Sequence, residues 1–126
     1  MTTQQKKKRL RNKCDKKYQE IGRMMYEDKG CLICGGTYSC LHHFYPKSTA
    51  SALRYNIKNG IPICVKCHCR VHSSDDPTIN LQIVEIRGKE WLRGLQSVKR
   101  NDFVKTSLKY YETVQKNLEL IKPYKV

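Results

Sequence analysis

Two C-x₂-C pairs constrain this chain more than any other sequence feature. The first pair is Cys31 and Cys34, and the second is Cys64 and Cys67. Each pair curls so that two thiolates converge, and four thiolates together satisfy the tetrahedral geometry of Zn²⁺. Disulfides or inert buried thiols are the alternatives for these four residues. The spacing predicts a structural zinc site held by both pairs.

Three cysteines remain outside these pairs, namely Cys14, Cys40 and Cys69. Cys40 or Cys69 could compete as a zinc ligand, but neither has a C-x₂-C partner. We therefore expect each of the three to serve in packing.

The composition explains why such a chain needs a bound metal. It has 126 residues, with only two Phe and one Trp. That length suits one domain, or one small domain with an extension, and two full cores are not expected. A small, lysine-rich chain with so little apolar bulk usually depends on disulfides or a metal.

The charge of the chain indicates its class of partner. A formal net charge of +14 points to a polyanion, with nucleic acid first and an anionic membrane surface second. No apolar run is long enough to span a membrane. No hydrophobic stretch follows the basic N-terminus, which argues against a secretory signal. A reduced, cytoplasmic setting is therefore expected.

Composition and hydrophobic spacing divide the chain into three parts. Residues 1–12 are polar and basic, and we expect a flexible tail there. Residues 13–76 contain one amphipathic helix, followed by the segment that carries all the histidines and most of the cysteines. The expected apolar face of that helix comprises Cys14, Tyr18, Ile21 and Met25. Residues 77–126 form an extension.

This C-terminal extension is expected to combine a short strand with helices. The strand would lie within residues 81–86. Residues 91–98 keep a helical period, and Asp102 is a credible N-cap for a further helix that Pro123 ends. The apolar stripes of these helices indicate core packing or contact with a partner helix.

The histidines are confined to two short motifs. His42 and His43 are adjacent, while His68 and His72 are four residues apart and directly follow the second cysteine pair. Two histidines at i and i+4 project from the same face of a helix and can therefore share one metal ion. Core or surface histidines clustered by chance are the alternative. The clustering favours a second, catalytic metal site.

These motifs together resemble the HNH, or ββα-metal, endonucleases in their zinc-stapled form. The resemblance covers about residues 14–72 and comprises, in order, the first cysteine pair, His42-His43, Asn59, the second cysteine pair, His68 and His72. Asn59 stands five residues before Cys64, where the family places its central Asn. Residues 53–55 and 59–64 are similar to phage members, including the NinG-type recombination nucleases.

The resemblance implies an α+β fold: a small ββα-metal finger with a four-cysteine structural zinc, flanked by an N-terminal helix and C-terminal helices. His43 would be the general base that deprotonates the attacking water, and Asn59 would fix its loop. His42, His68 and His72 would hold one catalytic divalent cation. The implied reaction is hydrolysis of a DNA phosphodiester bond, which a metal beside an imidazole is suited to promote.

One position departs from the common family pattern. Many members carry Asp where this chain has His42. Three imidazoles make a softer site than one with a carboxylate, which favours tight binding of Zn²⁺ or Ni²⁺. Mg²⁺, Mn²⁺, Ni²⁺ and Zn²⁺ are the candidates for the catalytic cation.

Several basic side chains near the motif are expected to contact DNA phosphates. They are Arg54, Lys47, Lys58, Lys66 and Arg70, with Arg54 the best candidate. A solvated surface position is the alternative for each. Phosphate contacts carry little sequence information, so DNA shape is the expected feature recognised. Likeness to phage recombination nucleases suggests branched or nicked DNA, in the cytoplasm of a host cell if the chain is phage-encoded.

Two further functions fit parts of the sequence. A non-catalytic zinc module that binds nucleic acid would use the cysteines and the charge, but has no need for His43, His68 and His72 together. A structural protein of a phage assembly would bind its partner through the C-terminal helices. Those helices could equally form a homodimer, which would suit a cut through both strands, since one HNH site cleaves one strand at a time.

Overall fold

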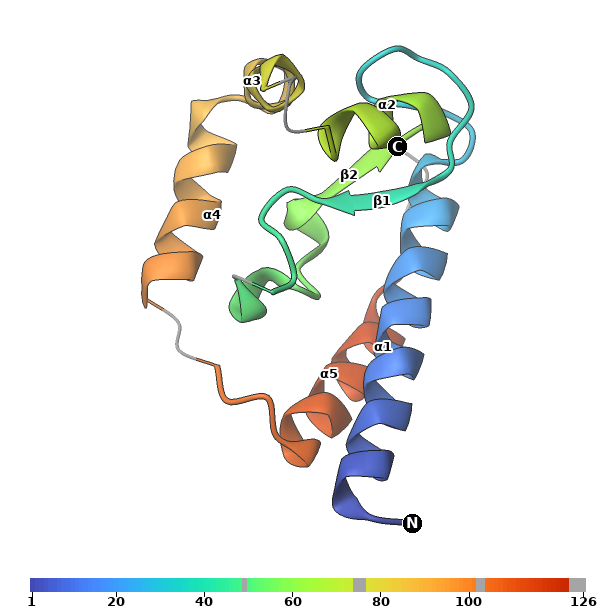
Figure 1. Ribbon diagram of the computed structural model, residues 1–126, viewed down its shortest axis with the longest axis vertical. Helices are drawn as coiled ribbons and strands as arrows, with labels where there is room; N and C mark the ends of the chain where they lie inside the picture. Colours follow the sequence, from blue (N-terminus) through green and yellow to red (C-terminus); the bar gives the residue numbers. More distant parts are fainter. Residues whose placement is uncertain (49, 74–76, 102–103, 123–126) are drawn as a thin grey trace.

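Figure 1 shows the computed structural model, in which a small hairpin and a short helix are flanked by longer helices. The structure describes residues 1–48, 50–73, 77–101 and 104–122. Strand β1 (Cys40–His43) pairs with β2 (Gly60–Ile63) in an antiparallel sheet, and α2 (Val65–Val71) follows β2 directly. The predicted mixed α+β class is confirmed.

Helix α1 (Thr3–Tyr26) is longer than the sequence predicted. A capping box starts it, because the Thr2 hydroxyl accepts from the Gln5 N–H while the Gln5 side chain accepts from the Thr2 N–H. In place of the flexible tail expected over residues 1–12, a regular helix thus begins at Thr3. Lys, Arg and Gln are strong helix formers, and Leu10 packs against the core.

The prediction of a strand within residues 81–86 is wrong, because helix α3 (Thr78–Arg87) occupies this segment. Ile79 and Ile83 are one helical turn apart and fully buried, whereas Leu81 is 68% exposed. The apolar residues therefore follow the helical period, with a buried stripe that starts at Ile79.

The helices expected further along are present. Helix α4 (Lys89–Asn101) includes residues 91–98, and α5 (Leu108–Leu120) lies beyond it. Helix α5 begins later than predicted: the Ser107 hydroxyl accepts from the Tyr110 N–H at 3.2 Å and supplies the N-cap. The predicted N-cap Asp102 and the predicted stop Pro123 lie outside the described residues.

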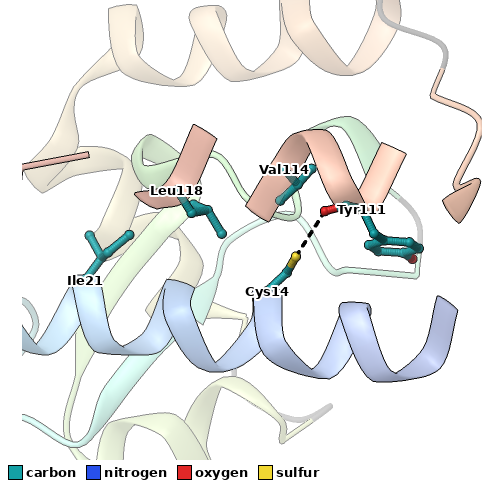
Figure 2. Close-up of a cluster of buried hydrophobic side chains, with 5 residues drawn as sticks. All are labelled: Cys14, Ile21, Tyr111, Val114 and Leu118. Carbon is teal, nitrogen blue, oxygen red and sulfur yellow. Dashed lines mark hydrogen bonds between the residues drawn. The ribbon is translucent and has the colours of Figure 1, made fainter. Parts of the chain in front are cut away.

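Three apolar clusters hold the helices, the hairpin and the segment between its strands together. In the first, α1 packs along α5 in the same direction, with Tyr111 beside Cys14 and Leu118 toward Ile21 (Figure 2). The second cluster surrounds the cysteines of the zinc motif, and α3 contributes Ile79 to it. The third joins α4 to the short 3₁₀ helix at residues 51–53, below the loop that follows β1. Among the described residues, no helix has both the length and the apolar character needed to cross a membrane.

Candidate metal centres

The four cysteines of the two pairs meet at one point. Cys31 and Cys34 lie on the turn after α1, and Gly35 closes that turn with a positive φ of 73°. Cys64 is the N-cap of α2, and Cys67 lies in its first turn. The four sulfur atoms are all within 4.8 Å of one another.

A backbone hydrogen bond favours the thiolate form of Cys64, whereas burial raises the pKa of Cys67 to about 12. The Cys67 N–H donates to Cys64 Sγ at 3.4 Å, and the Gly36 N–H donates to Cys34 Sγ at 3.4 Å. The bond from the Cys67 backbone lowers the pKa of Cys64 to about 7. A thiolate is the form that binds metal. The four residues are therefore positioned to hold a metal ion, and their chemistry fits a structural zinc.

The remaining cysteines lie outside this cluster. Cys14 is buried between α1 and α5, where its thiol donates to the Tyr111 carbonyl at 3.5 Å. Cys69 is exposed on α2. Cys40 is half-buried, with Sγ 3.5 Å from Nδ1 of His68. Cys40 thus contacts the histidine motif and also packs against the apolar cluster around the zinc-motif cysteines.

Three histidines form a second group. Alternation along β1 turns Cys40 and His42 toward α2, where His68 and His72 stand one turn apart. The Nε2 atoms of His68 and His72 are 3.0 Å apart, and the His42 ring centre lies 5.4 Å from that of His68 and 5.6 Å from that of His72. One ring nitrogen from each residue lies within 4.8 Å of the others.

Burial favours the neutral form of His42 and His68. Burial, followed by the nearby rings of His68 and His72, lowers the pKa of His42 to about 4. Burial, and then the charge of His72, also lowers the pKa of His68. A neutral imidazole has the lone pair that a metal requires. The three residues are therefore suited to hold one cation through nitrogen.

His43 points to the other face of the hairpin, toward α1. Its ring stacks on Tyr18, with centres 4.9 Å apart and planes 21° apart. Nε2 lies 2.9 Å from the Arg54 carbonyl oxygen, which can only accept, so Nε2 carries the proton. Nδ1 then keeps its lone pair, and burial lowers the pKa of the ring. This tautomer and charge suit a base.

Asn59 is fully buried beside this histidine. Its Oδ1 accepts from the Tyr45 N–H at 2.9 Å, and its Nδ2 donates to the carbonyls of Tyr45 and Leu53 at 3.1 and 3.2 Å. The Asn59 carbonyl also accepts from the Phe44 N–H. These bonds hold the loop that leaves β1 after His43.

A cavity of about 690 Å³ connects the two sets of histidines. His42, His43, His68 and His72 all line it. Lys47 lies at its edge with an exposed ammonium group. The candidate cation site, the candidate base His43 and the exposed side chain of Lys47 therefore surround one cavity.

Unlike Lys47, the other basic residues predicted to contact DNA do not line the histidine cavity. Arg54 is engaged in a bidentate pair with Asp15 of α1, at 2.7 and 3.1 Å, and its side chain is 19% exposed. The structure thus gives Arg54 a partner other than phosphate. Lys58 and Lys66 are exposed, and Arg70 is half-buried on α2. None of these last three lines the histidine cavity.

Sequence reasoning missed three residues of α1 that support the site. Asp15 holds Arg54, Tyr18 stacks on His43, and Gln19 forms two hydrogen bonds with the backbone of Leu41 at 2.9 and 3.0 Å. The available signal was their spacing, because positions i, i+3 and i+4 share one side of a helix. Of the three, only Tyr18 was expected on the apolar face of this helix, and neither Asp15 nor Gln19 was predicted to have a role.

No family model matches the chain, and neither a curated protein nor a solved structure matches it.

Proposed function

We propose that the protein is a metal-dependent endonuclease of the HNH type that hydrolyses DNA phosphodiester bonds. One observation carries the proposal. Three imidazoles converge on one point, while a fourth, His43, is oriented separately by Tyr18 and the Arg54 carbonyl on the same cavity. A cation site with a separately held base is what metal-assisted hydrolysis of a phosphodiester requires.

The chain's own residues divide the work of such a reaction. Nδ1 of His43 accepts a proton from a water molecule, whose oxygen forms the new bond to phosphorus as the bond to the leaving oxygen breaks. The leaving oxygen takes up a proton from solvent. A divalent cation, when held by His42, His68 and His72, supplies positive charge that stabilises the phosphate oxygens. Lys47 lies where it can bind a neighbouring phosphate.

The charge of the chain supports DNA as the substrate. A net charge of +14 gives strong, salt-sensitive attraction to a phosphate backbone. Recognition of branched or nicked DNA in phage recombination or replication is part of the proposal, and rests on the resemblance of residues 14–72 to phage nucleases.

The four-cysteine centre has a separate task in this proposal. It joins the turn after α1 to the first turn of α2, and so fixes the helix that carries His68 and His72. A structural zinc there would set the position of the catalytic histidines without entering the reaction.

The proposal is tested on supercoiled plasmid with wild type and His43→Ala. The protein is purified with zinc, and Mg²⁺, Mn²⁺ or Ni²⁺ is then added. Wild type should convert the plasmid to nicked or linear DNA, and His43→Ala should lose at least a hundredfold in rate, in line with removal of a general base. Unchanged zinc content and melting temperature of the variant show that folding is retained.

A second variant separates the two centres. His68→Ala should abolish cleavage and remove the second metal equivalent while leaving one zinc on the cysteines. If wild type cuts neither plasmid nor a branched substrate with any of these metals, yet binds DNA with steep salt dependence, the protein is a non-catalytic binding module. Full activity of His43→Ala would also reject the mechanism.

A further inference from the structure

The outer face of α1 is a polar stripe that the proposed reaction does not use. It comprises Arg9, Asn12, Lys16, Gln19 and Arg23, whose spacing alternates between three and four residues. Such spacing keeps all five on one side of a helix. The opposite side, with Cys14 and Ile21, is covered by α5 (Figure 2). The stripe is exposed apart from Gln19, which is half-buried.

Side chains within one turn of α1 contact the loop and strand that carry the histidines, and so fix the position of the stripe relative to them. Gln19 bonds to both backbone groups of Leu41, the residue before His42. Tyr18 stacks on His43, and Asp15 holds the residue whose carbonyl accepts from His43. The distance from the candidate cation site to each position along α1 is therefore set by the fold.

A second hollow continues from the histidine cavity onto the stripe. It measures about 330 Å³ and is lined by Lys16, Glu20 and Arg23 of α1 and by the start of β1. Gln19 and Cys40 line both this hollow and the histidine cavity. A strand lying in the histidine cavity can thus pass over Gln19 to the cationic side of α1.

Positive charge is concentrated in one direction along the helix. Residues 6–17 contain eight Lys and Arg and a single acid, Asp15, which is paired with Arg54. In the other direction, Arg23 is paired with Glu27 at 3.2 Å. The unbalanced charge therefore lies toward the N-terminus of α1 (Figure 1).

We infer that the outer face of α1 binds the sugar-phosphate backbone of a double-stranded DNA arm on one side of the scissile bond. This inference rests on the proposed nuclease function and adds the form of its substrate. At 1.5 Å per residue, Arg9 lies about 15 Å along the axis from Gln19. At 3.4 Å per base pair, that distance spans about four to five base pairs.

The side chains of the stripe favour duplex over single-stranded DNA. Proteins that bind single strands stack bases on exposed aromatic rings. In residues 3–19 the only aromatic residue is Tyr18, and it is 1% exposed. A straight helix with a row of cations instead suits the stiff backbone of a duplex, whose phosphates keep a regular spacing.

The first test measures binding of a 20-base-pair duplex as a function of salt, with His43→Ala as the parent so that cleavage is at least a hundredfold slower. The slope of log K against log salt is negative, and each lost phosphate contact reduces its magnitude by about one. Arg9→Gln with Lys16→Gln should therefore reduce the slope by about two. The matched control removes two exposed charges from α5, Lys109→Gln with Lys116→Gln, and should leave the slope within half a unit.

Glu20 gives a variant of opposite sign. Its carboxylate lines the second hollow, where it repels phosphate. Glu20→Gln should strengthen duplex binding, whereas the same change at Glu112 on the exposed side of α5 should not. Equal slopes for the stripe variant, the control and the parent would overturn the inference.

The second test maps cut positions on short, end-labelled duplexes with the active protein. On the labelled strand, wild type should leave the last four to five base pairs at one end uncut, while it cuts closer to the other end of that strand. The Arg9 and Lys16 variant should lose this asymmetry. Cleavage by wild type equally close to both ends would reject the docking role of α1 while leaving the nuclease intact. Absence of cleavage by wild type would instead reject the proposed function.

Discussion

At the scale of single residues, the adjacent histidines of β1 have unlike surroundings. Strand alternation turns His42 toward α2 and its two histidines, and turns His43 toward α1. His42 lies beside the rings of His68 and His72, while His43 lies beside the Tyr18 ring and the Arg54 carbonyl. One backbone step therefore separates a metal ligand from a base in the proposed site.

This difference predicts the pH dependence of cleavage. Burial lowers the pKa of His43 below its ordinary value of 6.5. The base works in its neutral form, so the rate should rise with pH through a midpoint below 6.5 and then level off. Initial rates at saturating Mn²⁺ measure this, and a doubled metal concentration should leave the midpoint in place. A midpoint above 6.5 would contradict the role of His43.

A second residue-level prediction concerns Asn59. Asn59→Ala removes three hydrogen bonds from a fully buried side chain, two with the backbone of Tyr45 and one with the Leu53 carbonyl. The free energy of unfolding should fall by about 2–4 kcal/mol. Asn56→Ala is the matched control, because it removes only an exposed bond to the Lys58 N–H and should cost under about 1 kcal/mol. Urea unfolding of both variants decides the matter; similar losses would contradict the prediction.

At the scale of elements, the sequence predicted the parts whose signals are local. The cysteine spacing predicted the cluster that forms, and the apolar period predicted the buried face of α1. The first turns of α1 were missed because their stability comes from helix propensity and a capping box rather than from an apolar stripe. How each helix docks depends on partners far away in the chain, which no local pattern records.

The segment of α3 illustrates this limit. Alternating apolar residues at 81 and 83 fit a strand as well as a helix. A third strand would need a free edge of the hairpin, and both edges are occupied. Gln19 bonds to Leu41 on the β1 side, and the Leu32 N–H donates to the Pro62 carbonyl on the β2 side. The segment therefore buries Ile79 and Ile83 as a helix.

The close approach of α1 to β1 predicts opposite effects at two helical glycines. A Cβ at Gly22 would overlap the Leu41 side chain, whereas at Gly94 of α4 nothing lies within 4 Å. Gly22→Ala should destabilise the fold by about 1–3 kcal/mol through overpacking. Gly94→Ala should stabilise it by about 0.5–1 kcal/mol, since Ala favours the helix. Thermal or urea unfolding compares the two, and effects of the same sign would contradict this packing.

At the scale of the whole molecule, the cysteine cluster is part of the core rather than an appendage. Three of its cysteines, Cys31, Cys64 and Cys67, pack with Ile63 of the hairpin and Ile79 of α3. Side chains of the C-terminal extension pack against residues 13–76. Helices α3, α4 and α5 each bury residues against earlier elements.

Loss of the structural metal should therefore weaken the entire fold. Cys64→Ser should lower the zinc content by about one equivalent and reduce stability, since metal-binding energy contributes to folding. Cys69→Ser is the matched control, because this cysteine is exposed and outside the cluster. Metal analysis and thermal unfolding test both variants. Unchanged zinc in Cys64→Ser would reject the assignment of the site.

The packing of α1 on α5 also affects the order in which parts of the fold can form during synthesis. The bond from Cys14 to Tyr111 joins residues 97 positions apart. A ribosome that adds about 5–20 residues per second needs about 5–20 s to make the intervening chain. The cysteine cluster, complete by Cys67, emerges well before α5 does. During synthesis, the helix whose Tyr18 stacks on His43 thus lacks its packing partner until translation has passed α5.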